Sequence, residues 1–482
     1  SQEYIAKALG ENWQEEYTVW DCAAGTGNLL AGLANKYNIW ASTIDQPDVD
    51  TMKTLIDEGF NLLPAHVFRF DFLNDPFDEL PPELKKIIDD PERRKKLIIY
   101  INPPYAEATS AATVTGTGKN KALVSTKHSA HTEYKDALGK AANEIYALFF
   151  IRIMSKLSGV WLAAFSTPKY LNSANFIKFR SFFSVKFKNG FICRADTFDN
   201  VNGKFPIGFL IWQLSHNGYD FKFPETVKLD VLDDEGKHIA KKIFHNGRKS
   251  INRWIKEFDM SNNGAIGFMS NPAPDFLPTN QPYITVTQGT RHFNYFALKE
   301  KNLIGGCIYF TVRLCIEPTW LNNRDQFLFP DNGYKTDMEF QNDCLIFTLF
   351  HGQNRISSND GVNHWIPFTE QEVNASEKFD SCFMSNYLKG KTFSSEADSV
   401  LKAGLELWKY YHAQKTKGNN PISVNASFYD IREYFQGRAR KGKMNSKSED
   451  ETYNKIIKTL RNKVKLLARK IEPKVYEYGF LK

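Results

Sequence analysis

The sequence has no uninterrupted apolar run long enough to cross a bilayer. Its longest apolar stretch, from Ile145 to Phe165, is broken by Arg152 and Lys156, whereas a transmembrane helix needs about 18 apolar residues in succession. The N-terminus also lacks a basic segment followed by an apolar one, so no signal peptide is expected. We therefore expect no membrane partner. The chain opens with Ser1 rather than Met, and we expect that residues upstream were cut away.

Cysteine and histidine are scarce and form no pattern typical of a metal site. The six cysteines include no C-x-x-C pair, which favours buried, reduced thiols in a cytoplasmic protein over disulfides or zinc ligands. No H-E-x-x-H occurs, and His128 and His131 form a lone H-x-x-H in a polar stretch. We expect no bound metal.

Most of the chain has no excess of positive charge, because the excess lies in its last 52 residues. The net charge is +7, and residues 431–482 hold 15 Lys and Arg against 6 Asp and Glu. The rest of the chain is therefore close to neutral. A basic end on a near-neutral body predicts a polyanionic partner, although a solvated helix face explains the charge equally well.

Short apolar runs and helical patterns alternate over the first 215 of the 482 residues. With 42% hydrophobic and 24% charged residues, the composition is that of a globular protein of two to four domains. Strands that are apolar on both faces and separated by helices predict an α/β fold with a parallel, doubly wound sheet, whose last two strands pair antiparallel. The expected strands are 18–23, 39–44, 66–70, 97–101, 160–165, 190–195 and 207–214, and the expected helices are 28–37, 49–60, 80–96, 143–157 and 174–187.

Residues 106–135 interrupt this alternation. They are rich in Ala, Thr, Ser, Gly and Lys and hold few large apolar side chains, so they cannot build a core. We interpret them as a cationic lid beside the site, while a surface insertion without a role stays open. The lysines of this segment are Lys119, Lys121, Lys127 and Lys135.

The texture of the sequence changes after residue 218. Aromatic residues, Asn and Gly become frequent, and the chain turns helical again from about 394. We expect a hairpin over 227–241, strand-like runs at 308–312 and 345–349, and a helix from a capping box at Ser448 and Glu451 to Pro473. The expected domains are 1–218, 219–400 and a basic helical region, 401–482.

Three features that suit a nucleotide-like ligand follow three successive expected strands. Gly25 and Gly27 let the backbone approach a ligand closely before a helix start. Asp45 lies about 20 residues on, where a carboxylate receives ribose hydroxyls. Asp71, followed by Phe72, can accept a hydrogen bond from an adenine amino group. Taken alone, the glycines could form an ordinary tight turn, and Asp45 and Asp71 could each be a helix cap.

The tetrapeptide Asn102-Pro103-Pro104-Tyr105 follows the fourth expected strand. Its two prolines fix a stiff turn without backbone donors. The Asn102 side-chain oxygen and the Pro103 carbonyl then remain as two acceptors, which suits an exocyclic amino group. Tyr105 can supply a stacking face. A merely proline-rich turn is the alternative.

These motifs resemble those of S-adenosylmethionine-dependent amino-methyltransferases, and within them the N6-adenine DNA methyltransferases of the gamma motif order. The matching segments are 20–30, 43–45, 70–72, 102–105 and Lys204-Phe205-Pro206; the family's Thr-Pro opening is replaced by Ser1 to Ala6. The resemblance implies a seven-stranded methyltransferase sheet followed by a mixed α+β DNA-recognition region, in a protein from a bacterium or phage.

The resemblance also implies roles for single residues. Asn102, Pro103 and Tyr105 would be catalytic, and Tyr105 and Phe205 would stack on a flipped adenine. The cofactor, S-adenosyl-L-methionine, would be bound by Asp21, Ala23, Gly25, Gly27, Asp45, Asp71, Phe72 and Asn102.

Double-stranded DNA is the partner that the family and the basic end imply, with a restriction or specificity subunit as a further partner. The cations expected to meet DNA are Lys119, Lys121 and Lys127 in the lid segment, Arg438, Arg440, Lys441 and Lys443, and Lys455, Lys458, Arg461, Lys465 and Arg469 on the last helix.

Other functions stay open. Asn-Pro-Pro-Tyr also occurs in methyltransferases that act on ribosomal RNA or on protein glutamine, and a degenerate fold could serve as a specificity or scaffold subunit. Asp230 with Glu235-Gly236-Lys237 loosely resembles a nuclease metal site, but a hairpin turn explains these residues better.

Overall fold

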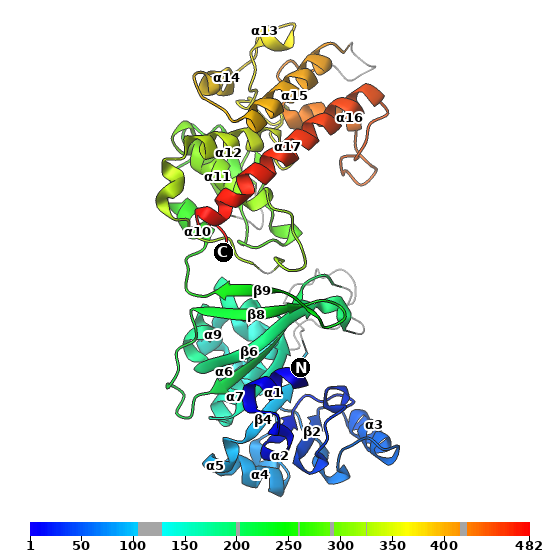
Figure 1. Ribbon diagram of the computed structural model, residues 1–482. Coiled ribbons are helices and arrows are strands. Elements are labelled where there is room, and N and C mark those ends of the chain that lie inside the picture. Colours follow the sequence, from blue (N-terminus) through cyan, green and yellow to red (C-terminus); the bar gives the residue numbers. More distant parts are fainter. Residues whose placement is uncertain (105–127, 199–202, 259–260, 290–293, 324, 415–421) are drawn as a thin grey trace. The chain divides into compact units, whose positions relative to one another are not determined.

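The computed structural model describes residues 1–104, 128–198, 203–258, 261–289, 294–323, 325–414 and 422–482. The chain divides into two compact units, Ser1–Gly247 with Thr319–Arg324 and Arg248–Pro318 with Asp325–Lys482. The first unit, which carries the N-terminus in Figure 1, is built around a large sheet.

The sheet of the first unit has nine described strands in the order β3-β2-β1-β4-β5-β7-β6-β8-β9 (Figure 1). Strands β1 to β5 are parallel to one another, whereas β7 runs antiparallel between β5 and β6. The predicted mostly parallel α/β sheet is therefore confirmed, and it holds two strands, β8 and β9, beyond the seven that were expected. The strands are β1 (Thr18–Asp21), β2 (Ile39–Thr43), β3 (Val67–Arg69), β4 (Leu97–Ile101), β5 (Trp161–Ser166), β6 (Val185–Arg194), β7 (Pro206–Leu214), β8 (Thr226–Leu232) and β9 (His238–His245).

Helices cover both faces of this sheet because alternate strand side chains point to opposite faces. On β4, Leu97 and Ile99 belong to a core cluster that includes residues of α4, α6, α7 and α9, whereas Ile98 and Tyr100 belong to a second cluster that includes residues of α1 and α3. The described helices of this unit are α1 (Gln2–Leu9), α2 (Trp13–Glu16), α3 (Gln46–Asp57), α4 (Pro82–Asp89), α5 (Pro91–Arg94), α6 (Ser129–Leu138), α7 (Ile145–Lys156), α8 (Lys169–Asn172) and α9 (Ile177–Phe182).

The expected hairpin forms, and it extends the sheet. Strand β8 pairs parallel with β6 and antiparallel with β9, and buries Leu229 and Val231. Asp230 accepts a hydrogen bond from the Tyr4 hydroxyl at 2.8 Å, and Glu235 pairs with Lys237 in the turn. The first segment of this unit therefore runs to Gly247, beyond the expected boundary at 218, because the hairpin extends this sheet.

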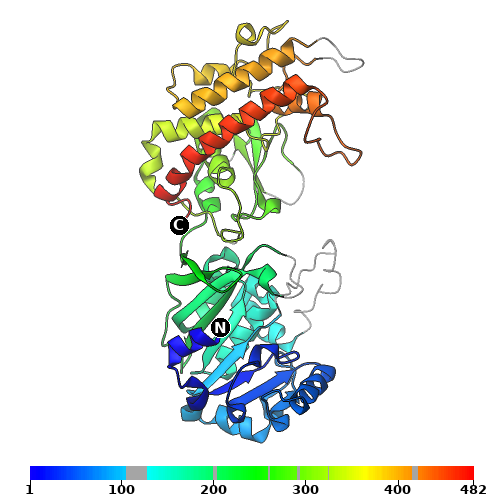
Figure 2. The same cartoon turned by 45° about the vertical axis from the view of Figure 1, so that its right-hand side comes forward.

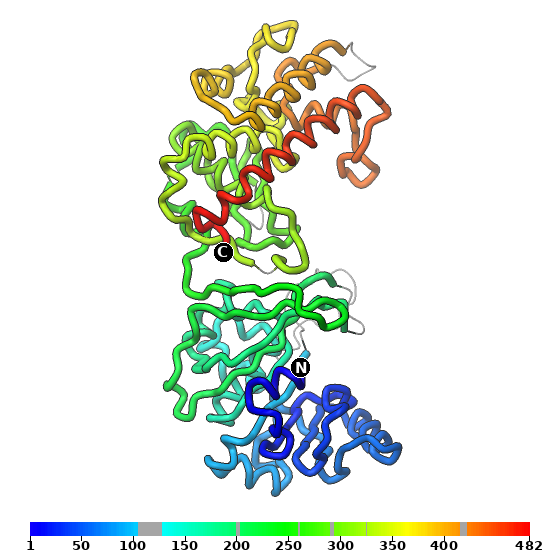
Figure 3. The backbone as a smooth tube through the Cα atoms, in the orientation of Figure 1, coloured from blue at the N-terminus to red at the C-terminus, as the bar shows by residue number. Residues whose placement is uncertain are grey.

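The second unit is mixed α+β, as expected. Its described sheet has the order β11-β10-β12, and α15 and α17 pack side by side (Figure 2, orange and red). Helix α17 is one continuous coil in the tube view of Figure 3. The elements are β10 (Gly267–Asn271), β11 (Ile284–Thr285), β12 (Asn294–Leu298), α10 (Ile251–Trp254), α11 (Leu303–Leu314), α12 (Met338–Phe350), α13 (Glu370–Val373), α14 (Phe383–Leu388), α15 (Ser395–His412), α16 (Phe428–Gln436) and α17 (Glu451–Glu477).

Several expected elements are wrong. The runs 308–312 and 345–349 lie in α11 and α12, because a short run that is buried on all sides has no periodicity to separate strand from helix. Residues 28–37 form no α-helix; Gly32 has φ +83°, which a right-handed helix cannot accommodate, and only short 3₁₀ turns form.

Other boundaries also differ. Part of the expected loop 106–135 is helix, since α6 begins at Ser129 and buries Ala130 and Tyr134. The expected helix 174–187 is shorter, and Val185 already belongs to β6. Finally, one of the six thiols expected to be buried, that of Cys382, is exposed.

Helix α17 starts and ends differently from the prediction. Asp450 is the N-cap, its carboxylate accepting from the Tyr453 backbone at 2.9 Å, so the capping box at Ser448 and Glu451 is wrong. Pro473 does not end the helix, which continues to Glu477. The missing amide removes one bond, and burial of Val475 beyond it holds the last turn in place.

Candidate functional site at the carboxyl edge of the sheet

The predicted site residues of the first unit lie at one edge of the sheet. Strands β1, β2, β3 and β4 are parallel, so their carboxyl ends, where Asp21, Asp45, Asp71 and Asn102 stand, share that edge. The strand order reverses between β1 and β4, because β2 and β3 lie on one side and β5 on the other. Crevices at such a switch point hold ligands in open α/β sheets.

The glycine loop after β1 needs its glycines for two different reasons. Gly25 and Gly27 have φ of +52° and +86°, which favour glycine. A Cβ on Gly27 would come within 3.3 Å of Met52 and Phe60 on the protein side, whereas a Cβ on Gly25 would meet nothing within 4 Å. Gly25 therefore borders open space, which a ligand can enter, and Gly27 packs against the core.

Asp21 ends β1 and is buried. Its Oδ1 accepts a hydrogen bond from the Ala23 backbone nitrogen at 3.0 Å, which holds the start of the glycine loop. Burial, only partly offset by this bond, raises the pKa of Asp21 to about 7. The side chain can exchange a proton at neutral pH.

Asp45 follows β2 as the N-cap position of α3, yet its side chain caps nothing. The carboxylate is exposed and makes no hydrogen bond or ion pair with a described residue. Beside it, Ile44 is 47% exposed. A free carboxylate next to an exposed apolar side chain suits a ribose and a base. The sequence analysis did not single out Ile44, although its place at a strand end was a signal.

Asp71 and Phe72 are more deeply engaged than the sequence suggested. The Asp71 carboxylate accepts from the Leu73 backbone at 3.1 Å and from Asn74 Nδ2 at 2.7 Å. Asn74 in turn accepts from the Ser129 backbone at 2.8 Å. The loop after β3 thereby fixes the start of α6, and only the remaining lone pairs of Asp71 can serve a ligand.

The ring of Phe72 is turned into the core. It is 2% exposed and stacks on Phe149 with the ring centroids 5.3 Å apart. Its side chain therefore contributes to the fold instead of presenting a face to a ligand.

Asn102 and Phe205 reach the same edge from different strands. Asn102 directly follows β4 and is exposed, and Pro103 is buried. Phe205 precedes β7, whose antiparallel register pairs Gly208 with Ser166 at the carboxyl end of β5. The structure thus brings Phe205 to the edge that carries Asn102. Tyr105, Lys119, Lys121 and Lys127 lie outside the described residues, as does most of the proposed lid.

Polar side chains that the sequence analysis missed surround the end of β5. Glu144, which precedes α7, and Lys169 of α8 form an ion pair of 2.9 Å, and both are largely buried. The hydroxyl of Thr167 is buried without a hydrogen-bond partner among the described residues. No motif marks these residues: Thr167 and Lys169 directly follow β5 in the chain, and only the fold brings Glu144 to them.

The predicted DNA-contacting cations of the second unit are exposed, but one is already engaged. The guanidinium of Arg438 bonds Glu433, donates to the Tyr429 hydroxyl at 2.7 Å and donates to the Gly442 carbonyl at 2.8 Å. These bonds close the turn after α16, so the charge of Arg438 is already engaged within the protein. The exposed cations are Arg440, Lys441, Lys443, Lys455, Lys458, Arg461, Lys465 and Arg469.

Two other kinds of feature, a metal-binding cluster and a membrane-spanning helix, are absent from the described residues. No cluster of three or more His, Cys, Asp or Glu side chains there could hold a metal ion. In that same part of the chain, no helix has the length and apolar character of a membrane span.

No protein-family model and no curated protein matches the sequence. Solved structures do match, at low similarity. DrdV in complex with DNA aligns at 14% identity and a TM-score of 0.32, covering 48% of this chain and 26% of that one. A type I restriction-modification methyltransferase subunit from Streptococcus thermophilus aligns at 14% identity and a TM-score of 0.31, covering 48% of this chain and 44% of that one. The type I restriction enzyme EcoKI M protein aligns at 12% and 0.30, covering 48% of each. The chain spans less than half of each of these proteins, and likenesses at this level carry no argument about function.

Proposed function

We propose that the first unit transfers a methyl group from S-adenosylmethionine to the N6 amino group of adenine in duplex DNA. One observation carries the proposal: Asn102-Pro103-Pro104 follows β4 at the point where the strand order reverses, next to the Asp21 glycine loop on β1. An amide oxygen and a proline carbonyl there can hold an amino group beside a bound cofactor.

The residues present fit the cofactor. Gly25 borders open space, the Asp45 carboxylate has no described partner, and Asp71 keeps unused lone pairs. Asp45 would take the ribose hydroxyls, Asp71 the adenine amino group, and Asp21 with the glycine loop the methionine end. When bound, S-adenosylmethionine supplies an electrophilic methyl group.

Orientation is the main work of the protein in this reaction. A base inside a duplex is out of reach, so the adenine must be flipped out. Asn102 and the Pro103 carbonyl would accept hydrogen bonds from its amino group and aim the nitrogen lone pair at the methyl group. Phe205 and Tyr105 would stack on the ring. No strong base is needed, because the proton can leave after methylation.

The second unit would hold the DNA. Its exposed cations on α17 and in the turn after α16 are suited to phosphates. A restriction or specificity subunit as a further partner belongs to the same proposal.

The decisive experiment supplies the protein with methyl-labelled S-adenosylmethionine and, in parallel, duplex DNA, ribosomal RNA or a protein mixture. We expect label in DNA, on the adenine N6 after hydrolysis and chromatography, and no label with Asn102→Ala. Label in RNA or protein but not in DNA would contradict the proposal and assign one of the alternative substrates.

A further inference from the structure

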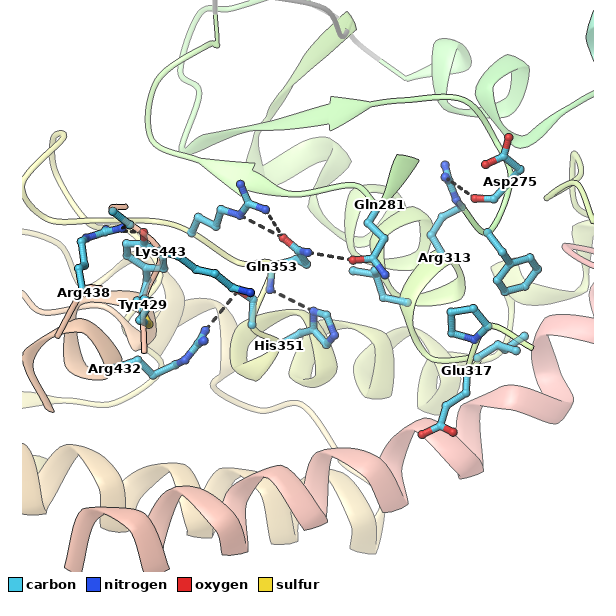
Figure 4. A pocket seen from close by; sticks show the side chains of 18 residues that line it. Asp275, Gln281, Arg313, Glu317, His351, Gln353, Tyr429, Arg432, Arg438 and Lys443 are labelled. Atoms are coloured by element: carbon cyan, nitrogen blue, oxygen red, sulfur yellow. Dashed lines mark hydrogen bonds between the residues drawn. The ribbon is translucent and has the colours of Figure 1, made fainter. Parts of the chain in front are cut away.

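A cavity of about 620 Å³ lies within the second unit, and two of the predicted DNA-contacting residues, Arg438 and Lys443, line it. Its walls come from the end of α11 and the segment after it, residues 275–281, the segment after α12, α16 and the turn that follows α16 (Figure 4). Figure 4 shows two ends. Arg313, Asp275 and Glu317 lie at one end, and Arg432, Arg438 and Lys443 at the other.

At the first end, the terminal nitrogens of Arg313 are hydrogen-bonded, although its Nε is buried without a partner among the described residues. The guanidinium of Arg313 donates to the carbonyls of Ala273 at 2.8 Å and Asn280 at 2.7 Å. These bonds tie loops together, and the two acidic residues of the cavity wall stand at this end. This end of the cavity is therefore poorly suited to binding an anion.

At the second end, Arg355, Arg432 and Lys443 have no counter-charge among the described residues, whereas Arg438 is paired with Glu433. Arg355 donates from Nε and Nη2 to the neutral Gln353 Oε1, at 3.0 and 2.6 Å. Arg432 donates only to the Gly352 carbonyl, at 3.3 Å, and its Nε is buried without a described partner. Neither of these arginines nor Lys443 forms an ion pair with a carboxylate in the part of the chain that the structure describes.

This arrangement is electrostatically unfavourable without a ligand. Burial, and the nearby charges of Arg461 on α17 and of Arg355, lower the pKa of Arg432. Clustered like charges repel one another, and a buried guanidinium nitrogen without an acceptor loses its hydration. An anion in this end of the cavity would relieve both costs.

Neighbouring groups hold the cations in place. Gln353 fixes the Arg355 guanidinium and itself donates to Gln281 at 3.0 Å, and the Arg355 guanidinium lies 4.4 Å from the ring centroid of Tyr283. Arg438, bound to Glu433 and Tyr429, closes the turn that carries Lys443. Pre-placed cations of this kind are suited to the fixed geometry of a phosphate.

We propose that Arg355, Arg432 and Lys443 at this end of the cavity bind a backbone phosphate of duplex DNA. The proposal rests on the proposed function, since it assumes DNA as the substrate. It adds a phosphate contact built from α16 and the segment after α12, and Arg461 links it to the exposed cations of α17.

The test measures binding of the full chain to a fluorescent duplex at several salt concentrations. We expect Arg355→Gln and Arg432→Gln each to bind about tenfold more weakly and to lower the slope of log affinity against log salt by about 1. Arg432→Lys, which keeps the charge, should retain the slope. Arg253→Gln removes another exposed arginine of the same unit and should match the wild type.

Two outcomes would overturn the proposal. Slopes that match the wild type in both Gln variants, with unchanged thermal midpoints, would exclude a DNA contact here. Stabilisation of the wild type but not of Arg355→Gln by inorganic phosphate, with unchanged DNA slopes, would assign the cavity to a small anion instead.

A parallel methyl-transfer assay with labelled S-adenosylmethionine distinguishes failure of this proposal from failure of the proposed function. Labelled DNA with unchanged slopes contradicts only the cavity. Reduced slopes without labelled DNA contradict only the methyl transfer, and failure of the wild type to bind DNA contradicts both.

Discussion

The Oδ1 atom of Asp21 lies 3.0 Å from the backbone nitrogen of Ala23, and this bond ties the end of β1 to the glycine loop. The side chain is 1% exposed, so one neutral donor stands against the loss of hydration of a full charge. Desolvation wins and raises the pKa of Asp21 to about 7. A ligand that brings positive charge near Asp21 would release its proton.

The first prediction concerns the pH dependence of stability. The folded protein keeps the Asp21 proton up to about pH 7, whereas the unfolded chain loses it near the ordinary value of 3.8. The retained proton therefore contributes on the order of 4 kcal/mol to the free energy of unfolding at low pH, and this contribution is lost as the pH rises from 3.8 to 7. Asp21→Asn keeps an acceptor for Ala23 and should lack this fall. Urea unfolding at pH 4 to 8 measures it. Asp57→Asn, an exposed carboxylate, should follow the wild type, and parallel curves for Asp21→Asn and wild type would contradict the assignment.

The second prediction is a cofactor-affinity measurement on Asp45. Asp45→Ala should bind S-adenosylmethionine more weakly by about 1.5–3 kcal/mol, which is typical of a hydrogen bond to a charged group. Asp57→Ala, an exposed carboxylate at the other end of the same helix, is the matched control and should bind normally. Calorimetry giving equal affinities for Asp45→Ala and wild type would remove Asp45 from the site.

The third prediction separates chemistry from binding at Asn102. Asn102→Ala should abolish methyl transfer while weakening cofactor binding far less and leaving the thermal midpoint nearly unchanged, because the lost oxygen orients the target amino group. Asn175→Ala changes an exposed asparagine of the same unit and should keep full activity. Near wild-type turnover by Asn102→Ala would show that the proline turn has another role.

The fourth prediction distinguishes free cations from an engaged one. Lys458 and Lys465 on α17 are exposed and make no ion pair with a described residue, so Lys458→Gln and Lys465→Gln should each lower the salt slope of DNA binding by about 1. Arg438→Gln should leave the slope nearly unchanged, because its guanidinium is paired with Glu433. Unchanged slopes for both lysine variants would return α17 to the role of a solvated helix face. A decrease for Arg438→Gln as large as theirs would contradict the distinction between free and engaged cations.

The sequence by itself determined the sheet and the order of the polar residues at its carboxyl edge. Strands such as Leu97–Ile101 are apolar on both faces, which only a sheet covered by helices can bury. Polar residues that follow such strands must come out at the carboxyl edge. For that reason the positions of Asp21, Asp45, Asp71 and Asn102 could be predicted from local pattern alone.

Only the tertiary structure decided which of these side chains remain available to a ligand. The Phe72 ring stacks on Phe149 of a distant segment. Asn74 occupies part of the Asp71 carboxylate by a local hydrogen bond, and the backbone of Ser129, 55 residues further on, bonds Asn74 in turn.

The tertiary structure also decided that α11 and α12 are helices, because their apolar residues are buried on all sides and show no period to separate helix from strand. Arg355 and Arg432 are 77 residues apart in the chain and line one cavity because α16 packs beside the segment after α12. The hydrophobic pattern of a sequence reports on the structure of neighbouring residues. A binding site, in contrast, is formed by the packing of segments that are far apart in the chain.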